Sequence, residues 1–272
     1  MTNRHPPQRL TDRSDVAGLR DRDLVVIHPD PDALAAAVAA RLVTAILDAQ
    51  ALRGSAHVVL TGGTVGTASL AAVLAEPAQA AVDWSRVDFW WSDERFEPTG
   101  SDLRNETGAR AAMLDHLPVD PARVHPMPAR GGEFGEDIAA AAAGYAAELA
   151  AAAPAGAAYP DFDVAMLGVG HDGHVASLFP GFSAPPEGAT VIAVLDSPKP
   201  PPTRISFTLP VINSAAAVWL VADGDAKAAA MAAALNPAPG ESPVPAGMVY
   251  GRAGTLALLD VAAAAQLART RR

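Results

Sequence analysis

Short runs of β-branched and other apolar residues alternate along this chain with longer alanine-rich runs, in which apolar residues recur at helical spacing. The short runs are typical of buried strands and the long ones of amphipathic helices. We predict strands at residues 23–28, 57–60, 87–91, 123–127, 162–167, 190–195, 204–209, 217–222 and 255–259. We predict helices at residues 31–50, 66–74, 105–117, 136–153, 225–235 and 261–269.

The alternation predicts an α/β fold, Rossmann-like, with a mostly parallel sheet and helices on both of its faces. We expect residues 1–20 to be a flexible N-terminal segment and residues 21–272 to form a single α/β catalytic domain. The proline-rich stretch 183–202 is interpreted as a long rim loop. Such sheets bind ligands at the carboxyl ends of their strands, so functional residues are expected there.

Composition narrows the classes of function. The 272 residues include no cysteine, which excludes disulfides, thiolate nucleophiles and cysteine-based metal centres. A formal net charge of −10, without a basic run before the terminal ARTRR, argues against a nucleic-acid partner. The apolar stretches are shorter than the ~20 residues of a membrane helix, and the start of the chain does not read as a secretory signal. We therefore expect a cytoplasmic protein, in which a locally positive site could still bind a small anion.

Two polar segments directly follow predicted strands. Gly62, Gly63 and Thr64 join the strand at 57–60 to a helix. Glycines there let the backbone approach an anion, and free N–H groups attract it, although a tight turn without a ligand fits the same residues. The charged triplet 93–95 (DER) follows the strand at 87–91 and is either part of a site or the start of a solvated loop.

The stretch 166–181, MLGVGHDGHVASLFPG, places His171, Asp172 and His174 between glycines at the end of an apolar run. A zinc site is disfavoured, because zinc sites usually need three protein ligands and H-E-x-x-H is absent. A glycine turn with solvated histidines remains an alternative. A histidine general base is the stronger functional interpretation, because an imidazole pKa near ~6.5 suits proton transfer at neutral pH. His174 begins an apparent helix and is the candidate base, whereas His171 is placed in the loop.

Two cations stand beside later predicted elements. Arg204 begins the strand at 204–209, and Lys227 lies in the first turn of the helix at 225–235. Each alone is an ordinary surface charge. A lysine at that end of a helix opposes the helix dipole, which favours a ligand role for Lys227.

In this order the segments resemble the 6-phosphogluconolactonases, which are related in fold to the glucosamine-6-phosphate isomerases/deaminases (NagB-like). The D-G-H-x-A-S-x-F-P signature is the specific part of the likeness, and the Thr-Gly-Gly-Thr turn alone is not specific. The matching residues span about 170 positions and comprise 61–64, 92–95, Asn105, 168–180, 199–201 with Arg204, and 224–227.

The resemblance implies hydrolysis of 6-phospho-D-glucono-1,5-lactone, a carboxylic ester, to 6-phospho-D-gluconate in the oxidative pentose phosphate pathway. It implies no metal and no other cofactor, and the only partner expected is this small phosphorylated sugar lactone, bound by a monomer or weak dimer. The implied catalytic residues are His174 as the base, Asp172 and Arg95. The implied substrate and phosphate contacts are Gly62, Gly63, Thr64, Asp93, Arg204 and Lys227.

Two other functions fit parts of the pattern. An isomerase/deaminase on the same fold has a glutamate where this chain has Phe179, and commonly a tyrosine where it has Arg95. A sugar-phosphate sensor would carry a DNA-binding module, but only about 20 residues precede the first predicted strand. Both comparisons favour the lactonase.

Overall fold

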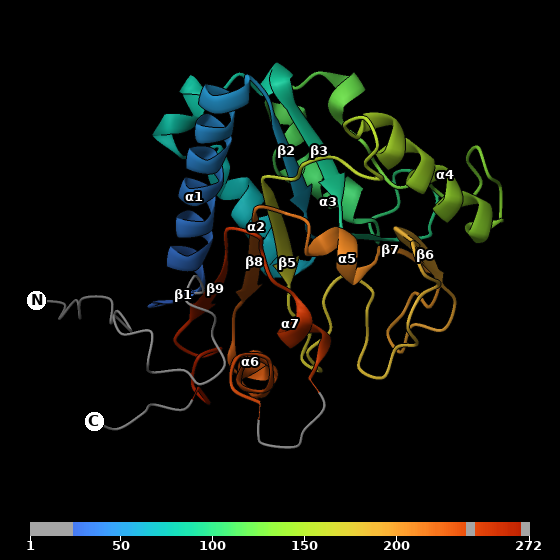
Figure 1. Cartoon of the computed structure of the whole chain (residues 1–272). Coiled ribbons are helices and arrows are strands. Elements are labelled where there is room, and N and C mark those ends of the chain that lie inside the picture. The colour runs from blue at the N-terminus through green and yellow to red at the C-terminus, as the bar shows by residue number, and fades with distance from the viewer. Residues whose placement is uncertain (1–23, 238–242, 268–272) are drawn as a thin grey trace, which may run out of the picture.

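The predicted parallel sheet is present. The computed structural model describes residues 24–237 and 243–267, and the predicted segment 1–20 lies outside these ranges. Six strands, all paired in parallel, follow the order β1-β9-β8-β5-β2-β3 (Figure 1). Their bounds are β1 Leu24–His28, β2 Ala56–Leu60, β3 Val87–Trp91, β5 Val164–Gly168, β8 Ala217–Ala222 and β9 Gly254–Asp260.

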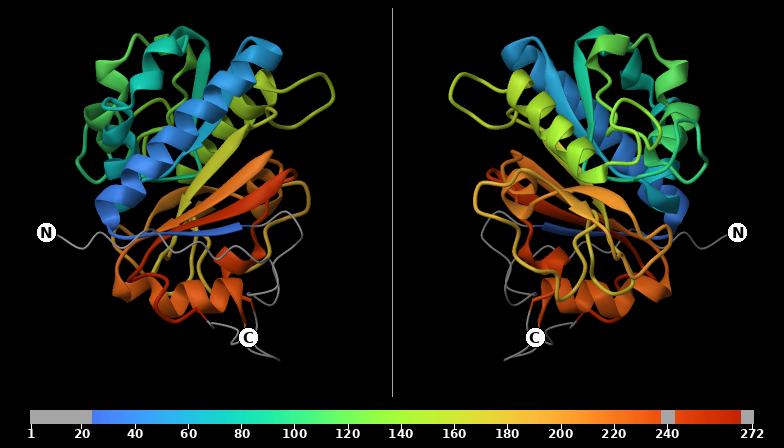
Figure 2. Two further views of the ribbon diagram at one scale, coloured as in Figure 1. Left: turned by 90° about the vertical axis from the view of Figure 1, so that its left-hand side faces the viewer. Right: turned by 90° about the vertical axis from the view of Figure 1, so that its right-hand side faces the viewer.

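Helices cover both faces of this sheet, as predicted. Side chains of α1 (Pro31–Arg53), α2 (Gly63–Val73) and α3 (Asn105–Ala112) pack in one buried cluster, and those of α4 (Ile138–Ala152) and α6 (Ala228–Leu235) pack in another. Alternate residues of β2 point into the two clusters, Val58 and Leu60 into the first and Val59 into the second. Figure 2 shows these layers from two sides. The sheet is therefore buried on both faces, which is why its strands are almost continuously apolar.

Local sequence signals set the ends of the longest helix. Asp30 caps α1 by accepting a hydrogen bond from the N–H of Ala33 at 2.8 Å, and Pro31 occupies the first turn, where its missing N–H costs nothing. Gly54 ends the helix with a φ of 79°, a conformation that favours glycine. These residues fix both ends of α1, and thereby the point at which the chain turns into β2.

A second, antiparallel sheet lies beside the first, in the order β4-β7-β6. Its strands are β4 (Asp93–Arg95), β7 (Arg204–Phe207) and β6 (Val191–Val194). The charged triplet is therefore a strand, and Asp93 and Arg95 pair with Ser206 and Arg204. The predicted strands at 190–195 and 204–209 exist but belong to this second sheet.

Other boundaries differ from the prediction. Residues 123–127 form no strand, because Pro126 and Pro128 remove backbone donors, and Val124 makes only an isolated bridge to Phe89. The predicted helix at 105–117 ends at residue 112, where Met113 leaves helical geometry with a φ of −146°. Residues 261–267 form turns with mostly i→i+3 hydrogen bonds instead of a helix, and 268–269 lie outside the described chain. The strand β4 and two short helices, α5 (Leu209–Ile212) and α7 (Pro245–Met248), are present although they were not predicted.

Ionisable groups around the buried Asp88 link β3 to α4 near the amino end of β3. Asp88 accepts hydrogen bonds from Arg123 at 2.6 Å and His125 Nε2 at 3.0 Å, and His125 Nδ1 lies 2.8 Å from Glu148. The ring of Trp90 stacks on His125 with centroids 3.8 Å apart. Burial alone lowers the pKa of His125, but the hydrogen bonds to the two carboxylates outweigh it and leave this pKa raised.

This raised pKa predicts pH-dependent stability. A raised histidine pKa contributes stability that is fully present below the unfolded value of ~6.5 and lost as pH rises through the folded value. We expect His125→Gln to reduce the free energy of unfolding by about 1–3 kcal/mol at pH ~6 and by less at pH ~9. Urea unfolding of both proteins at the two pH values measures this. An equal loss at both would show that His125 is not charged in the folded protein.

Candidate active site

A polar cavity of about 290 Å³ lies at the carboxyl ends of β2, β5 and β8. This is the edge where ligands of parallel sheets bind. All the predicted site residues line it except Asp172, which reaches it through His174, while His171 is exposed and does not line it. The polar and charged residues among the lining are Thr61, Thr64, Asp93, Arg95, Asn105, His174, Lys199, Arg204, Asp223 and Lys227.

The glycine turn forms the wall beneath α2. Gly62 is the N-cap residue of α2 and has no side chain to satisfy the first N–H groups of the helix, which line the cavity. A Cβ on Gly62 would lie 1.9 Å from Asn105 Oδ1, so only glycine fits there. The N–H of Gly168 donates to Thr61 Oγ1 at 3.0 Å and fixes the turn to β5. The turn thus combines a free helix N-terminus with close backbone access, the features of an anion site.

His174 and Asp172 form a pair on the opposite wall. Nδ1 of His174 lies 2.5 Å from Asp172 Oδ1, and the N–H of Gly170 donates to the carbonyl of His174 at 2.9 Å. Burial opposes ionisation of Asp172, yet the hydrogen bonds from His174 and the charge of Lys199 lower its pKa to about 2. An ionised carboxylate only accepts, so Nδ1 carries the proton and the lone pair of Nε2 is left for proton transfer.

The imidazole is held neutral. Burial lowers the pKa of His174, and the charge of Lys199 adds to this, against the opposing effect of Asp172. The ring of Phe179 packs against it with centroids 4.5 Å apart, and the guanidinium of Arg204 lies 5.8 Å from the centre of the same phenyl ring. A neutral imidazole with a free Nε2 can act as a base.

Four cations line the cavity: Arg95, Lys199, Arg204 and Lys227. Arg204 is only 4% exposed, and its guanidinium donates to the carbonyls of Pro201 and Lys199 at 3.1 and 3.2 Å. Burial lowers the pKa of the Lys227 amine, and the charge of Lys199 lowers it further. These cations outnumber the carboxylates of Asp93 and Asp223 among the described lining residues, so the cavity is net positive although the whole chain is negative.

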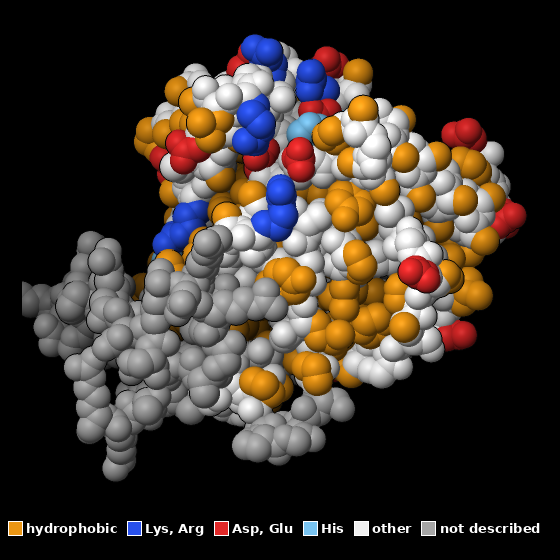
Figure 3. All heavy atoms as spheres, in the orientation of Figure 1, with side chains coloured by type: hydrophobic (Ala, Val, Ile, Leu, Met, Phe, Trp, Pro, Cys, Tyr) orange, Lys and Arg blue, Asp and Glu red, His pale blue; other side chains and the backbone are white. Residues whose placement is uncertain are grey.

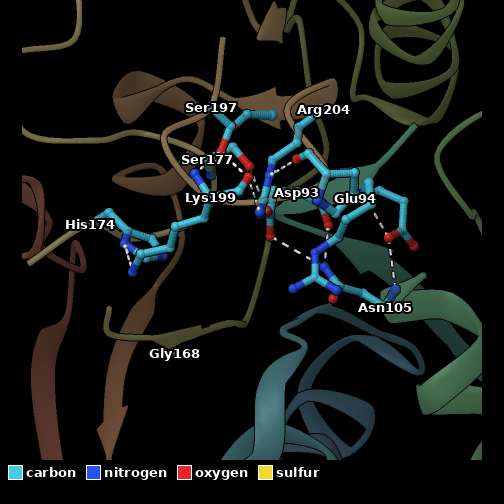
Figure 4. Close-up of polar contacts among 12 residues, drawn as sticks. Asp93, Glu94, Asn105, Gly168, His174, Ser177, Ser197, Lys199 and Arg204 are labelled. Atoms are coloured by element: carbon cyan, nitrogen blue, oxygen red, sulfur yellow. Dashed lines mark hydrogen bonds and ion pairs between the residues drawn. The ribbon is translucent and has the colours of Figure 1, made fainter. Parts of the chain in front are cut away.

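The carboxylates of the DER triplet are held by other protein groups. Asp93 accepts from Ser177 Oγ at 2.7 Å and lies 3.8 Å from Arg204 Nη1, and its carbonyl accepts from Asn105 Nδ2 at 2.9 Å (Figure 4). Glu94 is buried and accepts from the backbone N–H groups at the start of α3, those of Asn105 and Glu106, at 2.7 and 2.8 Å. Asp93 therefore lines the cavity and also orients its neighbours, while Glu94 caps a helix.

Sequence reasoning gave no role to Glu94, Ser177 or Lys199. All three stand inside the matched segments, but they act through partners in other elements, as Glu94 does with the start of α3 and Ser177 with Asp93 on β4. The only feature of the sequence that pointed to these three residues is that they lie in the segments that resemble the family. Figure 4 shows Lys199 extending toward His174.

A larger groove, of about 780 Å³, has a different character. It lies beside α5 and α7, and Glu187 is the only charged residue among the described residues that line it. Figure 3 shows hydrophobic side chains gathered on this part of the surface. The smaller cavity brings cations and hydrogen-bond donors together beside the His174–Asp172 pair, so it is the candidate site.

Within residues 24–237 and 243–267, no three histidine, aspartate or glutamate side chains are grouped to hold a metal ion. No helix in these ranges is both long and apolar enough to cross a membrane.

The fold and site define an α/β protein with a cationic pocket beside a His–Asp pair. A family model described as glucosamine-6-phosphate isomerases/6-phosphogluconolactonase matches residues 29–258, and the chain belongs to that family. It is 56% identical over 255 residues to a 6-phosphogluconolactonase of Streptomyces coelicolor, covering 93% of this chain and 97% of that protein. It is 48% identical over 244 residues to a 6-phosphogluconolactonase of Mycobacterium tuberculosis, covering 89% and 98%.

Solved structures agree with the NagB-like fold. The 6-phosphogluconolactonase of Trypanosoma brucei superposes with a TM-score of 0.77 at 26% identity, covering 91% of this chain and 99% of that one. A monomeric glucosamine-6-phosphate deaminase of the NagB superfamily superposes with a TM-score of 0.70 at 17% identity, covering 89% and 99%. The second likeness concerns the fold alone.

The lysines offer a direct test of anion binding. The chain has only two, Lys199 and Lys227, and both line the cavity. We expect inorganic phosphate to slow the reductive methylation of Lys227, because a bound anion shields the amine and keeps it protonated. Peptide mass spectrometry measures the rate, with chloride at equal ionic strength as the control. Equal rates in both salts would place the anion elsewhere.

Proposed function

We propose that this chain is a 6-phosphogluconolactonase, which hydrolyses 6-phospho-D-glucono-1,5-lactone to 6-phospho-D-gluconate with His174 as general base. The observation that carries the proposal is the arrangement of the cavity. It places the His174–Asp172 pair in the same small space as the free N-terminus of α2 and four cations. The 56% identity to a 6-phosphogluconolactonase over most of both chains supports the same substrate.

In the proposed mechanism, Nε2 of His174 takes a proton from a water molecule as its oxygen attacks C1 of the lactone. The carbonyl π bond opens to an oxyanion. When the carbonyl re-forms, the bond from C1 to the ring oxygen breaks, and the imidazolium returns its proton to that oxygen. Asp172 accepts the hydrogen bond from Nδ1–H throughout and stabilises the imidazolium. Proton transfer of this kind contributes about 10²–10⁴-fold to the rate.

The oxyanion needs a donor, and Arg95 is the one we assign. The backbone N–H groups of 168–170 already donate to Thr61, Val221 and His174, so they are not free for substrate. Arg95 lines the cavity and uses Nη1 to donate to the carbonyl of Leu103 at 2.6 Å, which leaves its Nη2 for a ligand. Charge-assisted donors placed before the reaction stabilise such a transition state.

The phosphate group of the substrate binds to the protein but takes no part in the reaction. We assign it to the N–H groups of Gly62, Gly63 and Thr64 together with Arg204 and Lys227, all of which line the cavity. Binding energy from this remote group holds C1 near His174. We infer a cytoplasmic enzyme of the oxidative pentose phosphate pathway, acting as a monomer or weak dimer without a metal, nucleic-acid or membrane partner.

The histidine assignment predicts a large loss of activity in His174→Ala. We expect the enzyme-dependent rate to fall by about 10²–10⁴-fold. Because the pKa of His174 is lowered, the acid limb of kcat/KM should lie below pH ~6.5. Lactone hydrolysis at slightly acidic pH, with the spontaneous rate subtracted, measures both.

A matched control exists three residues away. His171 is exposed and does not line the cavity, so His171→Ala should retain wild-type turnover. Turnover of His174→Ala close to that of His171→Ala would remove His174 from the mechanism.

The isomerase/deaminase alternative makes a distinct prediction. Phe179 packs on His174 where that activity would have a glutamate, so no carboxylate is available at this position. We expect no ammonia release from glucosamine 6-phosphate in a coupled glutamate dehydrogenase assay. Release at a rate comparable to lactone hydrolysis would favour the deaminase.

A further inference from the structure

We propose that Lys199 is a positioning residue for the His174–Asp172 pair. Its ammonium group secures Asp172 as an ionised acceptor, which keeps the imidazole proton on Nδ1 and the lone pair of Nε2 free for water. This inference rests on the proposed lactone hydrolysis and extends it to a residue outside the catalytic set named above.

The backbone around Lys199 is held in place although it lies in a proline-rich loop. Ser197 Oγ donates to the carbonyl of Lys199 at 2.9 Å and accepts from its N–H at 3.3 Å. The buried guanidinium of Arg204 donates to the same carbonyl at 3.2 Å, and the N–H of Ser197 donates to Pro202. The lysine therefore starts from a fixed backbone, which reduces the entropy lost when its side chain is ordered.

The side chain ends between the two members of the pair. Lys199 Nζ lies 3.5 Å from Asp172 Oδ1 and 3.2 Å from His174 Nδ1. An ammonium group has only donors, and Nδ1 already carries its proton toward Asp172, so the contact with Nδ1 is electrostatic. The ammonium attracts the carboxylate and repels a protonated imidazole, and both effects favour the neutral base.

The other charges facing the pair do not replace this contact. Asp93 favours protonation of His174, the opposite effect. The charges of Lys199 and Asp172 act on Lys227. Among the described contacts, however, no hydrogen bond or ion pair joins Lys227 to the imidazole. Arg204 is separated from the imidazole by Phe179, whose ring contacts both. Lys199 is thus the cation in direct contact with the catalytic pair.

Composition gives an independent indication that a compact cation is favoured here. The chain contains 18 arginines and only two lysines, yet both lysines line this cavity. An ammonium is a compact point charge, whereas a guanidinium is a wide planar fork. The charge beside Nδ1 also makes the transient imidazolium a stronger acid, which favours return of the proton to the ring oxygen.

The test is a histidine titration followed by NMR in Lys199→Met, with His174→Ala to assign the signal. Without the ammonium, we expect the His174 midpoint to rise by about one pH unit. Lys199→Arg should keep the midpoint near wild type, because it keeps the charge. Arg86→Met removes one exposed charge near the amino end of β3 and should not move it.

Kinetics supply the second readout. In Lys199→Met, kcat should fall about tenfold at neutral pH and the acid limb of kcat/KM should move to higher pH, with little change in KM. Lys199→Arg should recover part of the loss. Far-UV circular dichroism and thermal unfolding confirm that each variant is folded.

Two results would overturn the proposal: an unchanged His174 midpoint in folded Lys199→Met, or a rise in KM alone, which would make Lys199 only a substrate contact. The NMR titration needs no substrate, so it tests Lys199 even if the lactone is not hydrolysed. Absence of wild-type lactonase activity would instead reject the proposed function.

Discussion

The carboxylate of Asp93 joins the parts of the site that the chain supplies separately. It accepts from Ser177 in the loop after β5 and pairs with Arg204 on β7, while its backbone carbonyl holds Asn105 at the start of α3. Asn105 in turn lies against Gly62 in the glycine turn. Asp93 is only 7% exposed, and removing a partner from a buried charge typically costs about 3–5 kcal/mol. The geometry of the cavity therefore depends on this carboxylate, whether or not it also touches substrate.

Two sheets meet at this junction and make different contributions. The parallel sheet supplies the glycine turn after β2 and the histidine loop after β5, and the antiparallel sheet supplies Arg204 and the loop that carries Lys199. Backbone N–H groups and the His174–Asp172 pair thus come from the parallel sheet, and three of the four cations, Arg95, Arg204 and Lys199, come from the antiparallel sheet. The contacts of Asp93 therefore join the cavity residues that the two sheets supply.

Local patterns predicted much of this fold but not its second sheet. Apolar periodicity identifies strands and helices, and a glycine turn after a strand identifies one wall of the site, because both signals are local. The strand β4 carries three charged residues, which no hydropathy pattern assigns to a strand. Its pairing with β7 spans more than a hundred residues, and neither partner specifies the other in sequence. For the same reason Glu94 and Ser177 have roles that only the folded chain defines.

The carboxyl groups of Asp172 and Glu94 differ in pKa because their surroundings differ. Asp172 is partly exposed beside two groups that can carry positive charge, and its pKa falls to about 2. Burial raises the pKa of Glu94 to about 7, although Arg104 and three backbone N–H groups oppose this. The acceptor for His174 is thus ionised across the neutral range, while burial makes Glu94 a weaker acid than an exposed carboxyl group. A loss of activity at acid pH can therefore reflect protonation of His174, of Glu94 or of both, and only the protonation of His174 depends on the charge at Lys199. An NMR titration of the imidazole distinguishes the contribution of His174 from that of Glu94.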